Sequence, residues 1–250
     1  MKLLIIVAIL VICVGGAVTV YQSPVFSITS VRVTGADRLT NSYLERAAAV
    51  PAGSTLLRVD IKAIAQRLSN DPWVASARVE REFPSTLVLI IEERTPAALV
   101  EIYPDPILTD TVQWLISTDG MWLGVADDPD STSIVSLEEM EEYPRIVGIA
   151  FGIEPVYGKK NTDEGIKNAL AIIAGFSPEM LGLLANISAP DRNQTSLLLI
   201  NNVTVLFGAA EDIQAKETAI ITLLNEYPDT LISINVRVAD RPTRKLYPES

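Results

Sequence analysis

The sequence contains no histidine and a single cysteine, Cys13, among its 250 residues. Without histidine, neither a Ser-His-Asp nor a Cys-His catalytic set can form, and the commonest zinc and iron ligand is missing. A single cysteine provides neither an intramolecular disulfide nor a multi-cysteine metal site. We therefore expect no catalytic residues, no metal site and no cofactor, and a protein that is not an enzyme.

Paired carboxylates are the catalytic alternative that these absences leave open. A carboxylate enzyme needs two acids that converge in a pocket, one of them with a raised pKa. No acidic pair here lies in an apolar motif that indicates such a pocket. Asp127, Asp128 and Asp130 lie close together, but they lack the ligand order, the central glycine and the closing glutamate of a calcium loop. We expect a solvated acidic loop there.

Charge is distributed unevenly along the chain, whose net charge is −11. Residues 26–95 hold 9 basic and 8 acidic side chains, whereas residues 96–250 hold 10 basic and 23 acidic ones. Because an acidic surface repels phosphate backbones, we expect no nucleic-acid partner, and no motif points to a small-molecule substrate. The excess of acidic residues in 96–250 either keeps a large exposed domain soluble or contacts a basic partner.

An uncharged apolar run covers residues 3–20, with Thr19 as its one polar side chain. Eighteen helical residues span about 27 Å, close to the roughly 30 Å hydrocarbon core of a bilayer. Tyr21 follows where an interfacial ring is favourable, and Lys2 precedes the run, which indicates a cytoplasmic N-terminus. We therefore expect a minimal cytoplasmic tail at residues 1–2 and a transmembrane helix at residues 3–21.

A cleaved signal peptide is the alternative, since Gly15 and Ala17 are small and spaced like a cleavage site. Against it, the apolar run is longer than a usual signal-peptide core and continues past that site. A lipoprotein signal requires a small residue before the cysteine, and Ile12 is not small.

A first globular unit is predicted at residues 25–95, in the order strand, helix, helix, strand, strand. The strand at residues 25–33 stops at Gly35. Thr40 caps a helix that ends at Ala48, and Asp60 caps a second helix that ends at Asp71-Pro72. The last two strands, at 73–82 and 87–93, surround residues 83–85.

Two expectations concern side chains of this unit. We expect an apolar inner face on the last two strands, with Arg81 and Glu93 as a solvated cross-strand pair. Trp73 is expected in the core. The other inward residues are expected to be Ala75, Ala77 and Val79 on one strand and Leu87, Leu89 and Ile91 on the other.

A second globular unit is predicted at residues 96–240, followed by a polar tail at 241–250. Strands at 112–116 and 121–125 flank the turn residues Asp119-Gly120, and strands at 195–200 and 203–207 form another hairpin. Helices are predicted from 162 or 163 to 176 and from 211 to 227, before a final strand at 231–238. Strands mixed with helices indicate an α+β domain with a mainly antiparallel sheet.

The first unit resembles a polypeptide-transport-associated (POTRA) domain of the FtsQ/DivIB cell-division family. The fragments that carry the resemblance occur in the family's order directly after the apolar run: 31–35 (VRVTG), 51–53 (PAG), 56–60 (LLRVD), 72–74 (PWV), 77–81 (ARVER), 83–87 (FPSTL) and 92–98 (EERTPAA). The second unit resembles the β domain of the same family more loosely, through Asp119-Gly120, residues 208–216, 234–237 and 240–242.

The resemblance implies a membrane-anchored divisome scaffold that binds FtsB/DivIC-type and FtsL-type partners and helps control septal peptidoglycan synthesis. It implies a location in the plasma membrane at the septum, with the folded units outside the cytoplasm. The alternative is a POTRA-containing chaperone for outer-membrane or secreted polypeptides. Such proteins usually carry several POTRA repeats or a long barrel, and the sequence contains one copy and no barrel-length strand repeat.

The final predicted strand is the candidate partner-binding site. Because the chain ends shortly after it, we expect this strand at or near a sheet edge, where its backbone groups can pair with a partner strand. Ile232, Ile234 and Val236 are expected to point inward, and Ser233, Asn235 and Arg237 outward, with Arg237 able to pair with a partner carboxylate. The alternative is that this strand belongs only to the core.

Overall fold

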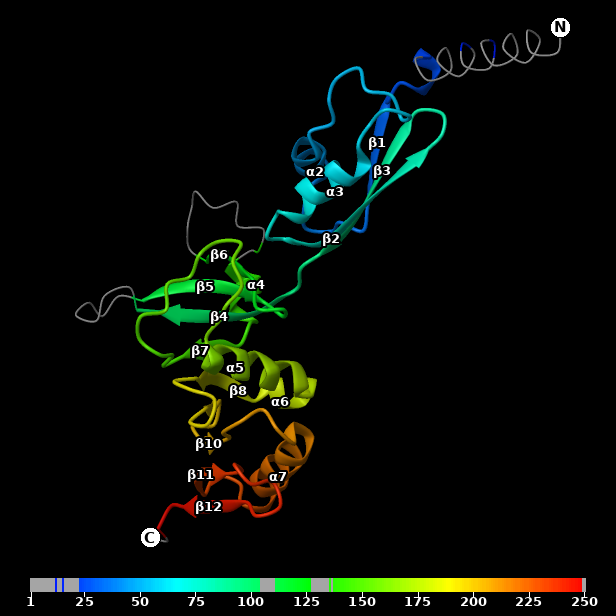
Figure 1. Cartoon of the computed structure of the whole chain (residues 1–250). Helices are drawn as coiled ribbons and strands as arrows, with labels where there is room; N and C mark the ends of the chain where they lie inside the picture. The colour runs from blue at the N-terminus through cyan, green and yellow to red at the C-terminus, as the bar shows by residue number, and fades with distance from the viewer. Residues whose placement is uncertain are drawn as a thin grey trace, which may run out of the picture. The chain divides into compact units, whose positions relative to one another are not determined.

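The computed structural model describes residues 23–103, 111–126, 135 and 137–248, together with Ile12 and Gly15. The expected tail at 1–2, almost all of the expected transmembrane helix at 3–21 and the loop of Asp127, Asp128 and Asp130 lie outside the described residues. The chain forms two compact units that divide between Glu93 and Arg94 (Figure 1). Each unit is described by itself.

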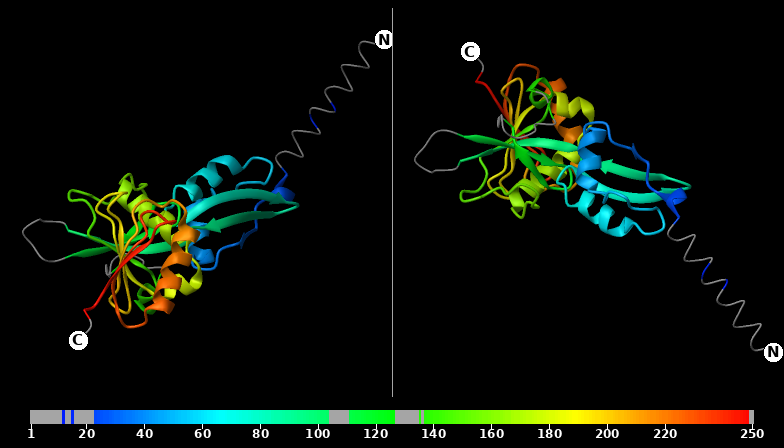
Figure 2. Two further views of the ribbon diagram at one scale, coloured as in Figure 1. Left: turned by 90° about the horizontal axis from the view of Figure 1, so that it is seen from below. Right: turned by 90° about the horizontal axis from the view of Figure 1, so that it is seen from above.

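The first unit is a three-stranded sheet with two helices on one face (Figure 2). The sheet order is β1-β3-β2, with β1 parallel to β3 and β2 antiparallel to it. The expected order of strand, helix, helix, strand, strand is confirmed. The elements are β1 (Ser30–Thr34), α2 (Asn41–Ala48), α3 (Ile61–Ser69), β2 (Val74–Glu82) and β3 (Thr86–Glu93).

Both predicted helix caps are present in this unit. The Thr40 hydroxyl accepts a hydrogen bond from the Tyr43 amide at 3.3 Å, and an Asp60 carboxylate oxygen accepts from the amides of Lys62 and Ala63 at 3.0 and 3.1 Å. The caps satisfy amides that have no partner inside the helix, which fixes where α2 and α3 begin.

The first strand begins later than the sequence predicts. Residues Pro24–Phe26 form a short 3-10 helix, whose cap is Ser23, and β1 begins at Ser30. On β2, a bulge between Val74 and Ser76 shifts the alternation of side chains, so Val74 is fully buried and Ala75 is exposed. The expectation that Ala75 faces inward is therefore wrong, whereas Trp73, 4% exposed, lies in the core as expected.

Arg81 and Glu93 do not pair with each other. The Arg81 guanidinium donates to the backbone carbonyls of Leu56 and Val59, at 2.5 and 2.8 Å. The Glu93 carboxylate instead accepts hydrogen bonds from the amides of Arg38 and Leu39. Each charged group thus fastens a distant loop to the sheet, a role that strand periodicity does not reveal.

The second unit contains a nine-stranded sheet in the order β12-β11-β10-β9-β8-β7-β4-β5-β6. Five of its pairings are antiparallel, and the β10–β11, β4–β7 and β7–β8 pairings are parallel, which confirms a mixed, mainly antiparallel sheet. Its strands are β4 (Pro96–Ile102), β5 (Val112–Ser117), β6 (Trp122–Val125), β7 (Arg145–Val147), β8 (Leu184–Ser188), β9 (Ser196–Leu199), β10 (Thr204–Leu206), β11 (Leu231–Asn235) and β12 (Thr243–Leu246).

Three helices pack against this sheet around the main core: α5 (Glu164–Gly175), α6 (Pro178–Gly182) and α7 (Ile213–Glu226). Phe176, at the end of α5, meets Phe207 edge to face, with ring centroids 5.6 Å apart. A short helix, α4 (Leu137–Glu141), precedes β7. Within the described ranges, no helix combines the length and the apolar character needed to cross a bilayer.

Candidate partner-binding edge of the second unit

The strand predicted to offer a free edge is paired on both sides. β11 lies between β10, to which it is parallel, and β12, to which it is antiparallel. The register of the second pairing sets Asn235 opposite Thr243 and Ser233 opposite Lys245. The expected free edge at 231–238 is therefore wrong, because the predicted polar tail folds back and adds one more strand.

The six predicted partner-contacting residues divide into three groups. Ile234 and Val236 are fully buried, as expected. Ile232 is only half-buried, because a bulge between Leu231 and Ser233 turns Leu231 inward instead. Ser233 and Asn235 are half-buried, and Arg237 is exposed beyond the strand, which ends at Asn235.

The open end of the sheet is β12. At the opposite end, β6 is covered, since the Trp122 amide donates to the Lys159 carbonyl and the Gly158 amide to the Trp122 carbonyl, both at 3.0 Å. Among the residues that the structure describes, nothing pairs with the outer side of β12 (Figure 1). The side chains of β12 are all exposed.

The alternation of backbone direction along β12 identifies its outward amides. The Tyr247 amide donates to the Thr230 carbonyl at 2.9 Å, so it points toward the β11 side. Because successive amides of a strand point to opposite sides, the amides of Arg244 and Leu246 face away from β11. These groups are the hydrogen-bonding positions that an added strand would use.

The β12 edge is basic, although the unit to which it belongs is acidic. Four of the ten basic residues after position 95 lie between 237 and 245, with Asp240 as the one acidic residue in that stretch. In the part of the chain that the structure describes, none of the four joins an ion pair. They are Arg237, Arg241, Arg244 and Lys245, hereafter the basic edge.

Arg244 also contacts an aromatic ring near the end of α7. Its guanidinium lies 4.1 Å from the centroid of the Tyr227 ring and donates to the Tyr227 hydroxyl at 2.5 Å. A hydrogen bond with the Glu226 carboxylate, together with desolvation, raises the pKa of Tyr227. The contact orients the Arg244 side chain, and it leaves the outward amide of the same residue available.

Buried polar side chains hold the loop between β10 and α7. The Lys216 ammonium, on a residue 2% exposed, donates to the carbonyls of Phe207 and Ala209 at 3.1 and 2.7 Å and lies 4.6 Å from the centroid of the Phe207 ring. Burial lowers the pKa of Lys216. At the start of this loop, the Leu206 carbonyl of β10 accepts a hydrogen bond from the Val236 amide, which directly follows β11, at 3.0 Å.

Asn168 on α5 fixes the other side of this loop. Its side-chain nitrogen donates to the Gly208 carbonyl at 3.0 Å and to the Thr195 hydroxyl at 2.8 Å, and its side-chain oxygen accepts from the Ala210 amide at 2.7 Å. Sequence reasoning missed both Lys216 and Asn168. Polar residues on amphipathic helices are ordinarily solvated, and no local signal distinguishes these two.

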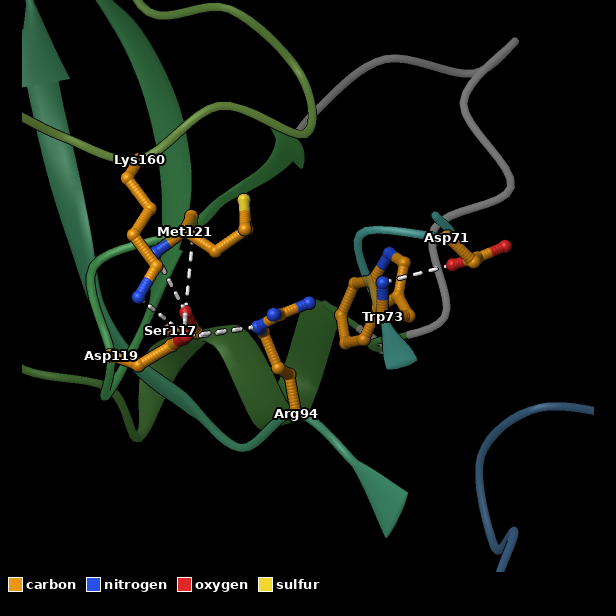
Figure 3. A network of polar contacts seen from close by, with 7 residues as sticks. All are labelled: Asp71, Trp73, Arg94, Ser117, Asp119, Met121 and Lys160. Carbon is orange, nitrogen blue, oxygen red and sulfur yellow. Dashed lines mark hydrogen bonds and ion pairs between the residues drawn. The ribbon is translucent and has the colours of Figure 1, made fainter. Parts of the chain in front are cut away.

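A second polar network braces the β5–β6 turn (Figure 3). Asp119 accepts from Arg94 Nε at 3.1 Å and from the Ser117 hydroxyl at 2.6 Å, and Lys160 Nζ lies 3.4 Å away. Desolvation raises the pKa of Asp119, but the hydrogen bonds from Ser117 and Arg94 and the two cations outweigh it, so the pKa is lowered. The network explains why Asp119-Gly120 forms the predicted hairpin turn.

Figure 3 also includes a contact inside the first unit, where the Trp73 amide donates to the Asp71 carboxylate at 2.9 Å. This bond closes the turn between α3 and β2. Neither network gathers groups that can exchange protons with a substrate, and we assign both of them to structure.

Comparisons with known proteins identify the first unit and relate most of the chain to one group. Residues 26–94 match the FtsQ-type POTRA domain. The chain is 30% identical over 235 residues to cell division protein FtsQ of Mycolicibacterium smegmatis. The aligned region covers 94% of this chain and 62% of the relative. The FtsQ of Mycobacteroides abscessus is 28% identical (97% and 69% covered), and that of Mycobacterium leprae 26% (92% and 59%).

The chain thus spans about three fifths to two thirds of the length of these relatives. The POTRA match covers the first unit, and the similarity to the relatives extends along both units. The chain belongs to the FtsQ/DivIB family of cell-division proteins.

Proposed function

We propose that this protein is a membrane-anchored, non-enzymatic divisome scaffold that binds FtsB/DivIC-type and FtsL-type partners and helps control septal peptidoglycan synthesis. The observation that carries the proposal is the open, exposed and basic β12 edge in a chain of the FtsQ/DivIB family. The proposed binding site therefore moves from β11 to the neighbouring strand.

Binding occurs by addition of a partner strand beside β12. The outward amides and carbonyls of Arg244 and Leu246 bond to the partner backbone, which supplies affinity with little dependence on sequence. Specificity comes from side chains. The basic edge favours a partner segment that carries carboxylates, because complementary charge speeds association and rejects other basic segments.

The apolar run at residues 3–21 anchors the protein in the plasma membrane, with the N-terminus in the cytoplasm and both folded units outside it, at the division septum. This part of the proposal is supported by the length and apolarity of the run and by family membership. The proposed role involves no nucleic acid, no small-molecule substrate and no cofactor.

A pair of variants at one position tests the edge directly. Leu246→Pro removes an outward amide of β12, whereas Leu246→Ala removes only the side chain of that residue. Binding of the full chain, held in nanodiscs, to the ectodomain of an FtsB/DivIC-type partner is measured by biolayer interferometry. We expect Leu246→Pro to weaken binding about tenfold or more, the equivalent of one lost hydrogen-bonded position, and Leu246→Ala to change it by less than about threefold.

Circular dichroism confirms that both variants remain folded. Equal binding by the two variants would show that the β12 backbone is not the docking surface. The unaltered chain is also compared for its binding to the partner ectodomain and to unrelated extended peptides. If it binds both equally well, the divisome assignment fails and the POTRA-containing chaperone alternative is favoured.

A further inference from the structure

Three uncharged segments form one end of the first unit. Residues 23–31, 47–57 and 83–91 contain no Asp, Glu, Lys or Arg, although charged residues make up 20% of the chain. Backbone hydrogen bonds bring the three segments together. Leu56 N donates to the Phe26 carbonyl at 2.8 Å, Ile28 N to Ser54 at 3.0 Å, and Thr29 N to Ser85 at 3.0 Å.

Large apolar side chains are exposed at this end. Val25 is 64% exposed and Phe83 is 56% exposed, and the Phe83 ring meets Phe26 edge to face with centroids 5.8 Å apart. Single exposed apolar residues are common on soluble proteins, but a cluster of them on three uncharged segments, bordered by Arg58, Arg81 and Glu82, marks an interaction surface. We call this surface the apolar tip; its exposed residues are Pro24, Val25, Pro51, Ala52, Phe83 and Pro84.

The apolar tip lies where the chain arrives from the N-terminal run. The short helix that contains Val25, the loop before α3 and the β2–β3 turn lie at the same end of the unit (Figures 1 and 2). Val25 follows Val20, the last residue of the apolar run, by five positions. Five residues span at most about 17 Å, so an inserted run holds the tip within reach of the lipid headgroups.

The sequence between the run and the tip fits the same position. No charged residue occurs from Leu3 to Val31. The chain can therefore approach the membrane interface there without desolvating a charge, which is costly. Aromatic rings such as Phe83 and apolar side chains such as Val25 gain free energy at the boundary between headgroups and hydrocarbon.

We infer that the apolar tip contacts the lipid bilayer that holds the chain's own anchor, with Phe83 and Val25 in the interfacial region. The inference rests on the membrane anchor of the proposed function. Contact at a second point, besides the anchor, restricts how the first unit tilts and rotates over the membrane surface. A single tether of a few residues at Ser23 does not impose that restriction.

Fluorescence quenching by brominated lipids tests the contact in the full chain. Phe83→Trp keeps an aromatic ring at the tip, and Asn70→Trp sets a matched exposed tryptophan at the other end of β2. That strand has nine residues and spans about 30 Å. Native Trp73 and Trp122 are 4% and 3% exposed, so they are shielded from lipid quenchers. Native Trp114 is half-buried, and the unaltered chain measures its contribution.

After subtraction of the unaltered chain, we expect the tryptophan at position 83 to be quenched at least about twofold more than the one at position 70, because quenching requires contact with the lipid chains. Equal quenching at the two positions, or none at position 83, overturns the inference. Adding Val25→Ser to Phe83→Trp is expected to reduce the quenching, and unchanged quenching would also contradict it.

Flotation with vesicles separates this inference from the proposed function. A chain that floats but shows no selective quenching at position 83 retains its anchor and loses the tip contact. A chain that does not float has neither. Partner binding at β12 is measured independently, so its failure leaves the tip contact standing.

Discussion

At the residue scale, Asn168 shows how much one buried amide can hold together. Its side chain is 5% exposed and joins α5 to Thr195 and to both sides of the loop that begins α7. Its four polar contacts lie in the interior, where water cannot replace them. The residue therefore ties together parts of the sheet that precede β11 and β12 in the chain.

Asn168→Ala should destabilise the second unit, because it leaves the Gly208 carbonyl and the Ala210 amide without a partner. We expect the free energy of unfolding to fall by about 2–3 kcal/mol, measured by urea denaturation of the full chain in detergent. Asn193→Ala, at an exposed position nearby, is the control and should change it by less than about 0.5 kcal/mol. Equal losses in the two variants would contradict the assigned role.

At the element scale, the short strand β12 depends on its neighbour rather than on its own composition. β12 consists of Thr, Arg, Lys and Leu between two prolines, a composition typical of a tail. Pairing with β11 makes it a strand, and its position at the end of the sheet makes it an edge. The β5–β6 turn is different, since Asp119-Gly120 is a local turn signal that Arg94 and Ser117 reinforce.

The β5–β6 turn should contribute stability that depends on pH. Because the folded-state pKa of Asp119 is lowered, its contribution is complete above the unfolded value near 3.8 and is lost as the pH falls through the lowered value. The side chain is 40% exposed, so solvent screening limits the contribution to less than about 1 kcal/mol. Asp119→Asn should therefore lower the stability at neutral pH and approach the unaltered chain in acid.

Urea denaturation across the acid range checks this convergence. Glu154→Gln, at an exposed carboxylate, is the control and should run parallel to the unaltered chain. A difference between Asp119→Asn and the unaltered chain that stays constant with pH would show that the hydrogen bonds to Arg94 and Ser117 do not depend on the ionised carboxylate.

At the scale of the whole molecule, charge is arranged so that the acidic second unit ends in a basic edge. The net charge of −11 repels acidic partners at long range, whereas the basic edge attracts them at the binding strand. If the proposed function holds, an acidic partner segment is directed toward the β12 end of the sheet. Salt should weaken this attraction, because the exposed charges are screened beyond about 8–10 Å at physiological ionic strength.

Reversal of two edge charges tests the direction of this effect. Arg241→Glu with Lys245→Glu should slow association with the partner ectodomain about tenfold, and the loss should shrink at high salt. The control is Arg58→Glu with Lys62→Glu, which changes the net charge equally at exposed positions of the first unit. If the control slows association as much, net charge rather than the basic edge governs encounter.

The sequence by itself determined the features that rest on local physics. Caps at Thr40 and Asp60, the Asp119-Gly120 turn and the amphipathic patterns of α5 and α7 lie where the residues predict them, because neighbouring atoms satisfy those groups. The ordered motifs from Val31 to Ala98 likewise led to the family, which the match at residues 26–94 confirmed.

Only the tertiary structure decided which strand is the edge and where several charged groups lie. β12 exists because β11 supplies its hydrogen bonds, and Arg81, Glu93 and Lys216 bond to backbone groups of loops 7 to 55 residues away in sequence. No sequence periodicity and no sequence motif indicates such contacts. Their energy comes from groups that meet only after the chain has folded, so the position of the open edge could not be read from residues 231–250 alone.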